Sequence, residues 1–540
     1  MPPEPALPDA SVAPGAAARR PPRRAPRRRR RLIVRLLLGA ALCAWLGCAW
    51  WQTHKALPPG THVAGPWSEL PASDVDFVAD ITTADAYGRP ILSHAIFDEM
   101  LRLARAAQHF IVIDTQLFAA EEAARGGAMP LQPLSAQLRD ALIACRQRSP
   151  GLHILFITDP LNEGYGTAPA RDLQALRSAG IDVVSVDLDR LRDPNFLYSS
   201  LRRLLLSWWR AAPGEGGLPN PLGGGPAQLP AAAWARLLDL KSDHRNVMLA
   251  DDAHGDLVGL ISSDSPQRAV SADSTVGVTL RGVVLEPLLA SELAVARFSG
   301  WRGELPNRGA PLGTESLERD GASPSFGEPR SGQALPPLGV GVIAGRILTE
   351  GAIGDALLTR IGSTWRGDTI DVGALYLADR PLIDALLAAS RRGVSVRLIL
   401  DPNKEAFGRT VSGVPNRPAA SELVTASDGA IRVRWYRTHG ERFAATLVTI
   451  ADHDRLWLLT GSANLTRRSL EDYDLDSEVE LQMPRSSALA QQVSQYFETL
   501  WSNRAPLGIE YTTEVGVYAD ASPVSYWRYR LLEALGLSLF

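Results

Sequence analysis

The order of predicted strands and helices repeats in the two halves of the chain. Residues 92–118 predict an amphipathic helix and then the strand FIVIDTQLF, and residues 350–377 predict a helix and then TIDVGALYL. In each half a second helix and strand follow, and that strand ends in Asp-Pro, at Asp159 and Asp401. Third strands are predicted at 181–188 and 431–436. Runs of β-branched residues alternating with helices favour parallel α/β layers, so we expect two repeated α/β lobes.

Composition sets the boundaries of these lobes. Residues 301–338 are rich in Gly, Pro, Ser and charge, which is typical of a flexible linker or a long exposed loop. We therefore expect a first lobe at 75–300, a second lobe at 339–506, and a C-terminal tail at 507–540.

The N-terminus predicts a membrane anchor. Residues 1–31 are Pro, Ala and Arg in low complexity, a composition typical of disorder. Residues 32–51 are apolar apart from one arginine, and about 20 helical residues cross a hydrocarbon core of ~30 Å. Ten arginines within the first 35 residues place the N-terminus in the cytoplasm by the positive-inside rule. The body then lies outside the cytoplasm, on the periplasmic side if the source is bacterial.

Two alternatives to an uncleaved anchor remain open. A cleaved signal peptide lacks a clean Ala-x-Ala site after the apolar run. A lipoprotein would use Cys48, but Trp45 and Leu46 make a poor lipobox. Cys43 also lies in the run, so the body has one thiol, Cys145, and forms neither an internal disulfide nor a Cys-based zinc site.

Charge argues against a nucleic-acid partner. Ten arginines against two acidic residues give the first 35 residues a formal charge of +8, so the net charge of −3 leaves −11 on the other 505. Nucleic-acid binding depends largely on neutralising phosphates, and a body with this charge has no bulk attraction for DNA or RNA.

Two segments rich in polar groups carry a recognisable signature. The second half contains LLTGSANLTRRSLEDYDLDSEVEL at 458–481, and the first contains HRNVMLAD at 244–251. They resemble the phospholipase D superfamily, whose signature is His-x-Lys-x4-Asp followed by Gly-Ser-x-Asn, once in each half. The resemblance covers residues ~75–505, and it implies two α/β lobes packed face to face across one active site.

The resemblance also implies the chemistry. One His attacks phosphorus and forms a phosphohistidine, and the other His protonates the leaving oxygen and then activates water or an alcohol. Lys, Ser and Asn side chains hold the phosphoryl oxygens. The substrate would be a phospholipid or another phosphodiester, with no metal and no other cofactor.

In the first half the signature is partly kept. The resemblance implies that His244 is the nucleophile and that Asp251 is the acidic position. Asn246 occupies the Lys position, and Ser263 and Ser265 occupy the Ser and Asn positions, where they would bind phosphate.

In the second half the loss is greater. Ser462 and Asn464 are intact and would bind phosphate, but the His and Lys positions fall on Ala444 and Thr446. Glu478 matches an acid that supports the His of one lobe. One His and both Lys of the signature are therefore missing.

Neighbouring side chains could substitute for the missing groups. His439 or His453 could reach the cleft through a loop, and Lys241 could do so through a turn. Arg245 should point away, because adjacent residues in a strand face opposite sides. Ordinary structural roles are also open: His244 as a core histidine, and Ser462 with Asn464 as caps of a turn.

Two functions follow. The first is a membrane-anchored phospholipase D-like phosphodiesterase or phosphatidyltransferase with impaired turnover, because losing a general acid costs ~10²–10⁴ in rate. The alternative is a non-catalytic phosphate- or lipid-binding protein, or a scaffold, at the membrane. A nuclease is disfavoured by the acidic body. The segment LRRLLLSWWR at 201–210 either lies in a membrane interface or packs its Leu/Trp face on its own lobe.

Overall fold

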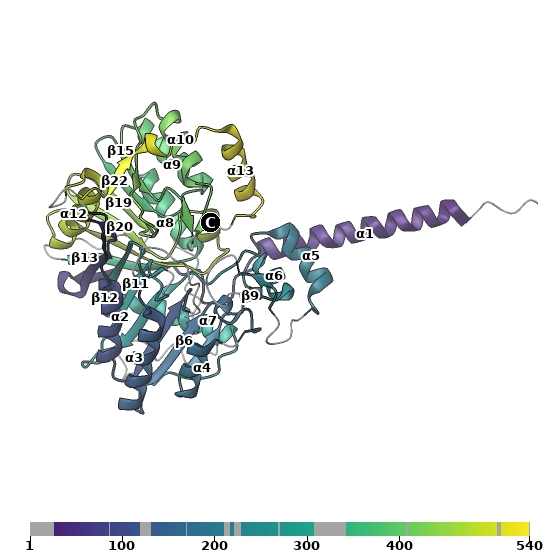
Figure 1. Ribbon diagram of the computed structural model, residues 1–540, viewed down its shortest axis with the longest axis horizontal. Coiled ribbons are helices and arrows are strands. Elements are labelled where there is room, and N and C mark those ends of the chain that lie inside the picture. Colours follow the sequence, from purple (N-terminus) through teal and green to yellow (C-terminus); the bar gives the residue numbers. More distant parts are fainter. Residues whose placement is uncertain are drawn as a thin grey trace, which may run out of the picture.

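Two large sheets form the body of the protein (Figure 1). The computed structural model describes the following residues: 26–85, 87–118, 131–168, 170–209, 216–220, 228–267, 270–306, 342–406, 409–504 and 509–538. The predicted linker falls almost entirely outside these ranges.

The first sheet has seven strands. In spatial order they are β2 (Val75–Asp80), β12 (Thr275–Arg281), β11 (Leu257–Ser262), β10 (Asn246–Asp251), β5 (Phe110–Thr115), β6 (His153–Thr158) and β7 (Asp182–Ser185).

The second sheet has nine strands. In spatial order they are β1 (Ser68–Pro71), β13 (Val342–Thr349), β21 (Ser477–Pro484), β20 (Arg455–Gly461), β19 (Leu447–Ala451), β14 (Thr369–Ala374), β15 (Ser395–Leu400), β18 (Arg432–Tyr436) and β22 (Thr512–Glu514).

The two sheets repeat one topology. The order from β13 to β18 matches the order from β2 to β7, strand for strand. Only β5, β6 and β7 pair in parallel in the first sheet, as β14, β15 and β18 do in the second. The other pairs are antiparallel, and tight hairpins connect two of them, β10–β11 and β19–β20. The expected parallel layers are therefore mixed sheets.

The sheets meet face to face, and helices cover their outer faces. One core contains Leu249 and Val278 from the first sheet together with Leu458 and Val479 from the second. The outer helices of the first lobe are α2 (Ala95–Ala106), α3 (Leu134–Arg148) and α4 (Arg171–Ser178). Those of the second are α8 (Gly351–Gly362), α9 (Arg380–Arg391) and α10 (Asn416–Ala426). This arrangement confirms the predicted pair of α/β lobes.

Further helices and three two-stranded ribbons complete the fold. The remaining helices of the body are α5 (Phe196–Leu206), α6 (Ala231–Leu237), α7 (Glu286–Phe298), α11 (Arg467–Leu470), α12 (Ala488–Ser502) and α13 (Pro523–Ala534). Three ribbons are β3 (Thr83–Ala84) with β4 (Pro90–Ile91), β8 (Leu218–Pro219) with β9 (Gln228–Leu229), and β16 (Glu405–Ala406) with β17 (Arg409–Thr410).

The second lobe takes in residues beyond its predicted range. β1 and β22 form the two edges of its sheet, and the aromatic ring of Tyr529 in α13 is part of its core. These edge strands are only four and three residues long, too short to show an alternating pattern.

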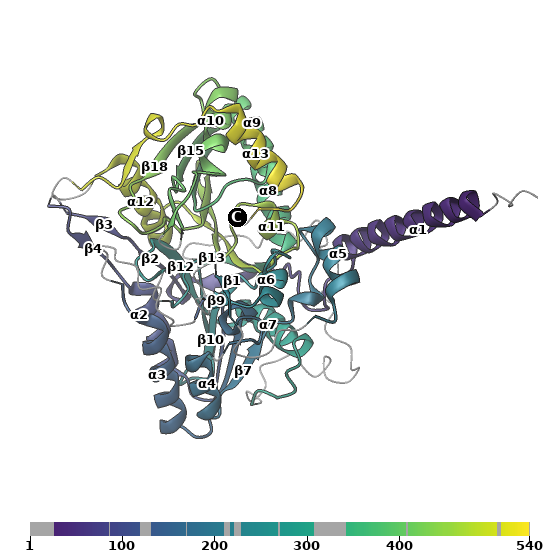
Figure 2. The same cartoon turned by 45° about the vertical axis from the view of Figure 1, so that its right-hand side comes forward.

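A long helix, α1 (Pro26–His54), projects away from the body (Figure 2). Its segment Arg30–His54 is apolar and long enough to cross a membrane, and only 6% of the most apolar part of this segment is buried against the rest of the protein. Residues 26–31, predicted to be disordered, form the first turns of this helix. Arginine favours helix as strongly as leucine does, which explains why the anchor extends into the basic segment.

Candidate functional site

A pocket of about 130 Å³ opens between the two lobes. From the first lobe it is lined by His244, Asn246, Ser263 and Ser265, and from the second by Ala444, Thr446, Ser462 and Asn464. Six of the eight predicted site residues therefore meet in one place, together with the two positions that lost their signature residue.

The pocket is built by a pseudo-twofold repeat. The backbone N–H of His244 donates to the carbonyl of Leu475 at 2.8 Å, and that of Ala444 donates to the carbonyl of Ser274 at 2.8 Å. Each bond joins one lobe to the other, with the roles of the lobes exchanged. Ala444 is thus the structural equivalent of His244.

His244 has an acidic partner from the opposite lobe. Its Nδ1 lies 3.6 Å from Oδ1 of Asp476, whose side chain is fully buried, and Ser462 donates its hydroxyl to the same Oδ1 at 3.0 Å. Burial alone would lower the pKa of His244, but the hydrogen bond and charge of Asp476 outweigh it, and the pKa is raised. The arrangement favours a proton on Nδ1 and leaves Nε2 as the nucleophilic nitrogen.

The equivalent pair in the other half is absent. Ala444 has no imidazole. Thr275 is the equivalent of Asp476, because each is the residue after the carbonyl that accepts the inter-lobe hydrogen bond, and Thr275 has no carboxylate. Among the described residues that line the pocket, His244 is the sole histidine. His453 lies in the β19–β20 turn with 96% of its side chain exposed, and His439 lies near Glu441, outside the lining. Neither replaces the missing imidazole.

The two lysine positions also carry neutral groups. The side chains of Asn246 and Ser265 are hydrogen-bonded to each other at 2.8 Å, and Thr446 also lines the pocket. Lys241 reaches the pocket lining, but its Nζ is 2.8 Å from Asp193 and donates to the carbonyl of Leu188.

Arg245 points away from the pocket, as strand alternation predicts. It is fully buried against Glu292 and Glu350, at 3.1 and 2.6 Å.

Two arginines supply positive charge that the sequence analysis missed. Arg442 pairs with Asp273 at 2.6 Å, Arg468 pairs with Asp474 at 2.8 Å, and all four residues line the pocket. Arg468 lies four residues after Asn464, in the segment that carries the resemblance, and Arg442 lies two residues before Ala444. Their positions could have been considered from this spacing, but their inward direction depends on contacts between segments far apart in sequence.

Two predicted residues lie outside the pocket lining. Asp251 stands at the far end of β10, where it accepts from the backbone N–H of His109 at 2.9 Å and contacts the His109 ring at 2.6 Å, so that it ties β10 to the start of β5. Glu478 is buried in β21 opposite Gly461, and burial raises its pKa well above the ordinary value. Asp476, two residues earlier on the same face of the chain, makes the contact with His244 that was predicted for Glu478.

The repeated Asp-Pro aspartates hold the residues next to the two signature positions. Asp159 accepts from the backbone N–H of Asp243 at 2.8 Å, and Asp401 accepts from that of Phe443 at 2.7 Å. Each also accepts a backbone hydrogen bond within the turn that ends its strand, from the N–H of Leu161 and of Asn403 respectively. Burial raises the pKa of Asp159 to about 6 and that of Asp401 to about 7.

Within the described residues no group of three His, Cys, Asp or Glu side chains is placed to hold a metal ion. The pocket instead offers one imidazole, two arginines and a set of hydroxyl and amide groups. Such donors suit a phosphoryl group, whose oxygens accept hydrogen bonds from each of them.

Comparison with known proteins gives a consistent picture. The family described as "Cardiolipin synthase, PLD-like domain" matches residues 357–501. Among solved structures, the phosphatidylserine synthase of Haemophilus influenzae Rd KW20 aligns over 87% of this chain and 97% of its own, with 11% identity and a TM-score of 0.52. No curated protein sequence matches the chain.

Two further solved structures align with lower TM-scores. A polyphosphate kinase from Porphyromonas gingivalis covers 86% of this chain and 53% of its own, with 12% identity and a TM-score of 0.41. The phospholipase D family member Nuc from Salmonella typhimurium covers 29% and 95%, with 20% identity and a TM-score of 0.22.

Proposed function

Because this chain belongs to the phospholipase D superfamily, we propose that its pocket binds the phosphodiester of a phospholipid and transfers the phosphatidyl group slowly through His244. The observation that carries the proposal is that His244 and Ser462, from opposite lobes, line one pocket and both contact the buried carboxylate of Asp476. α1 would anchor the protein in the membrane, with the basic N-terminus cytoplasmic and the body on the other side.

The reaction would begin with attack of Nε2 of His244 on phosphorus. A P–N bond forms, the P–O bond to the leaving alcohol breaks, and the proton from Nδ1 is held against Asp476. Arg442 and Arg468 would hold the phosphoryl oxygens. The leaving oxygen must take its proton from water, because Ala444 stands where the second imidazole would lie. The hydroxide that remains, or an acceptor alcohol that gives its proton to that hydroxide, would then attack phosphorus; the P–N bond breaks and the imidazole of His244 is regenerated. Without that general acid the rate falls by ~10²–10⁴.

A second candidate is a binding protein without turnover. It is favoured by the joint loss of the second imidazole and its carboxylate, at Ala444 and Thr275. The surviving Ser462 and Asn464 would then hold a headgroup phosphate with no covalent step.

The test uses the full-length chain in phosphatidylcholine and phosphatidylglycerol vesicles, with release of the headgroup as the readout. We expect slow release that His244→Ala abolishes and that His453→Ala, a change at an exposed histidine, leaves intact. Absence of release, with phosphate binding weakened by Asn464→Ala but not by His453→Ala, would select the binding protein. If neither release nor binding responds to changes in the pocket, both proposals fail.

A further inference from the structure

The helix α5 has its polar and apolar faces reversed relative to a helix on a water-facing surface. An apolar stripe with the spacing i, i+3, i+4 and i+7 is formed by Leu201, Leu204, Leu205 and Trp208. The exposed fractions of these residues range from 44% to 76%. A water-facing helix normally turns such a stripe toward the core. Here the stripe faces outward.

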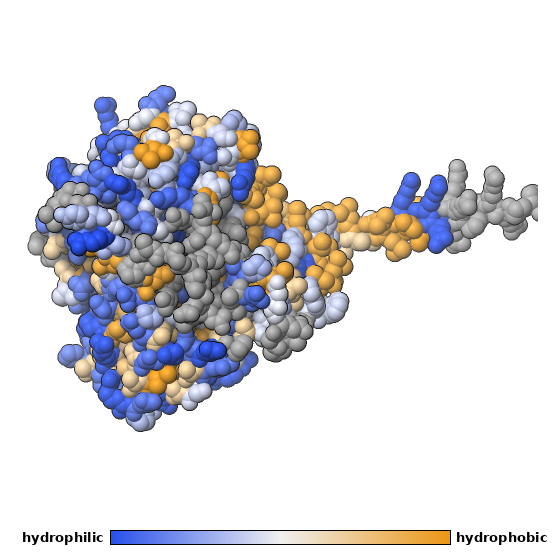
Figure 3. Space-filling model, viewed as in Figure 1, coloured by the Kyte–Doolittle hydropathy of each residue, from blue (hydrophilic) through white to orange (hydrophobic). Residues whose placement is uncertain are grey.

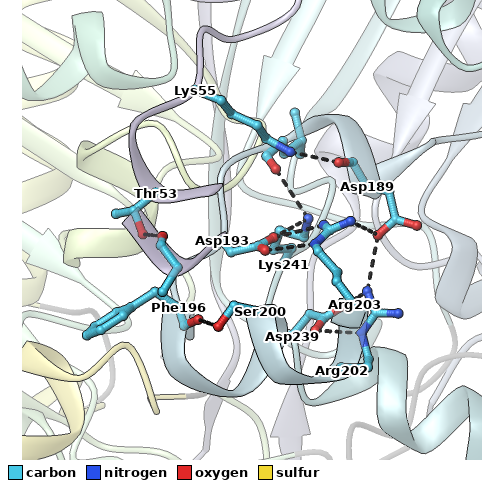
Figure 4. A network of polar contacts seen from close by, with 12 residues as sticks. Thr53, Lys55, Asp189, Asp193, Phe196, Ser200, Arg202, Arg203, Asp239 and Lys241 are labelled. Atoms are coloured by element: carbon cyan, nitrogen blue, oxygen red, sulfur yellow. Dashed lines mark hydrogen bonds and ion pairs between the residues drawn. The ribbon is translucent and has the colours of Figure 1, made fainter. Parts of the chain in front are cut away.

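The charged side of α5 points into the protein (Figure 4). Arg203 pairs with Asp193 at 3.0 Å, and Arg202 pairs with Asp239 at 2.6 Å. Lys241 joins Asp193 from the pocket side. Turning the leucines inward would separate these buried charges from their partners, which is strongly unfavourable. The outward direction of the apolar stripe is therefore fixed by the ion pairs.

The last turns of α1 pack beside α5. Trp45 donates its indole N–H to the carbonyl of Leu197 at 2.9 Å, and the backbone N–H of Asp193 donates to the carbonyl of Gln52 at 3.1 Å. Trp50 and Trp51, at this end of α1, are 64% and 60% exposed. Tryptophans at the end of an apolar span are typical of the membrane–water interface, so α5 lies at that level of the anchor.

A second helix extends the same face. In α13, Val524, Trp527 and Leu531 follow the spacing i, i+3 and i+7 and are 76%, 67% and 59% exposed. Figure 1 places α13 on the side of the body from which α1 leaves, and Figure 3 shows apolar surface at that edge of the body.

The segments that flank the two helices also meet. Gly536, just after α13, lies so close to Pro194, just before α5, that a Cβ on the glycine would fall 1.8 Å from the Pro194 oxygen. The same segment reaches the pocket wall, because Arg468 donates to the carbonyl of Ser538. The apolar face formed by Leu201, Leu204 and Leu205 of α5, by Trp208 in the turn that follows α5, and by Val524, Trp527 and Leu531 of α13 is called the α5–α13 face.

We propose that the α5–α13 face docks on a lipid bilayer, so that the body rests on the membrane surface rather than hanging from α1 alone. The occupant is lipid because a candidate membrane span is packed against one of the two helices and ends in exposed tryptophans beside it. Leucine and tryptophan side chains on an interfacial helix enter the boundary between headgroups and acyl chains. The docking is independent of any turnover in the pocket.

The test measures how deeply each helix lies in lipid. The full-length chain, with Cys43, Cys48 and Cys145 replaced by Ala, carries a single nitroxide introduced by Leu205→Cys or Leu531→Cys and is reconstituted into phosphatidylcholine–phosphatidylglycerol vesicles. Tyr87→Cys is the matched control, because Tyr87 is 85% exposed and lies in the turn between β3 and β4, two strands that are on the side away from α1 in Figure 2. Collision rates with oxygen, which concentrates in lipid, and with a water-soluble nickel chelate are compared.

We expect oxygen collisions to exceed nickel collisions at both 205 and 531, and the reverse at 87. Position 531 is decisive, since α13 is on the other lobe from the helix that contacts α1. Equal behaviour at 531 and 87 would overturn the proposal by placing α13 in water. Protection of 205 and 531 from both reagents would also overturn it, because it would assign the face to a second copy of the chain.

Discussion

The charge of Asp476 should control the protonation of His244, and the geometry sets the size of the effect. At 3.6 Å and an effective dielectric constant of ~20, two opposite charges interact by about 4.6 kcal/mol, which corresponds to about 3 pKa units as an upper bound. Neighbouring opposite charges shift pKa values by about 1–3 units in practice. Asp476→Asn should therefore lower the pKa of His244, because the burial that opposes protonation remains while the hydrogen bond and the charge that most raise the pKa are removed.

The change has a signature in stability as well. Since the pKa of His244 is raised in the folded protein, its stabilising contribution is fully present below about pH 6.5 and is lost as the pH rises through the folded pKa. Asp476→Asn should therefore destabilise the protein more at pH 5.5 than at pH 8.5.

The pKa is measured by NMR titration of the full chain in detergent with ¹⁵N-labelled histidine, where His244→Ala identifies one signal among nine residues. Ser462→Ala is the matched control: it removes a hydrogen bond to Asp476 but keeps the carboxylate charge, and its effect on the pKa should be the smaller of the two. A pKa of His244 that is unchanged or higher in Asp476→Asn would refute the electrostatic account of the pair.

Three other predictions concern the framework of the protein. Arg245→Met should lower the free energy of unfolding by about 3–5 kcal/mol, because it removes the cationic partner of two buried glutamates. Arg437→Met, at an exposed ion pair, is the control and should lower it by about 1 kcal/mol or less. Similar losses for the two variants in denaturant unfolding would contradict this prediction. Gly536→Ala should lower the free energy of unfolding by about 1–3 kcal/mol, because the glycine has φ +64° and no room for a Cβ. Gly516→Ala, where a Cβ would meet open space, is the control and should leave the thermal midpoint nearly unchanged. Equal midpoints for the two variants would rule the contact at Gly536 out. Lys55 should titrate near pH 8, because burial and the charges of neighbouring basic side chains lower its pKa. NMR can follow its signal, because the chain has only three lysines. Titration at the ordinary value of 10.5 would count against the packing around the end of α1.

Much of the architecture could be predicted from local patterns. The strands that end at Asp159 and Asp401 were visible as apolar runs with an Asp-Pro stop, and the repeated order gave two lobes. The gathering of Ser462, Asn464 and His244 in one pocket followed from that repeat. Each of these inferences uses spacing along the chain, which the sequence displays directly.

Other features depend on contacts that spacing does not encode. Asp476 and Glu478 lie two residues apart on one side of the chain, so alternation alone could not decide which of them reaches the imidazole. The direction of Arg442 and Arg468 is set by their acidic partners. The sequence of α5 predicts an amphipathic helix but does not show whether its apolar face points inward or outward. The apolar face points outward because carboxylates from distant segments, such as Asp239, pair with the arginines on the other face.

The matched aspartates at the ends of β6 and β15 show that the frame around both signature positions has been kept alike, although only one position retains an imidazole. A pair of interchangeable halves would accept a diester in either orientation. On the proposed function, the single imidazole would attack from one side only, so the direction in which a phosphodiester enters would decide which of its two ester bonds lies opposite His244 and is broken.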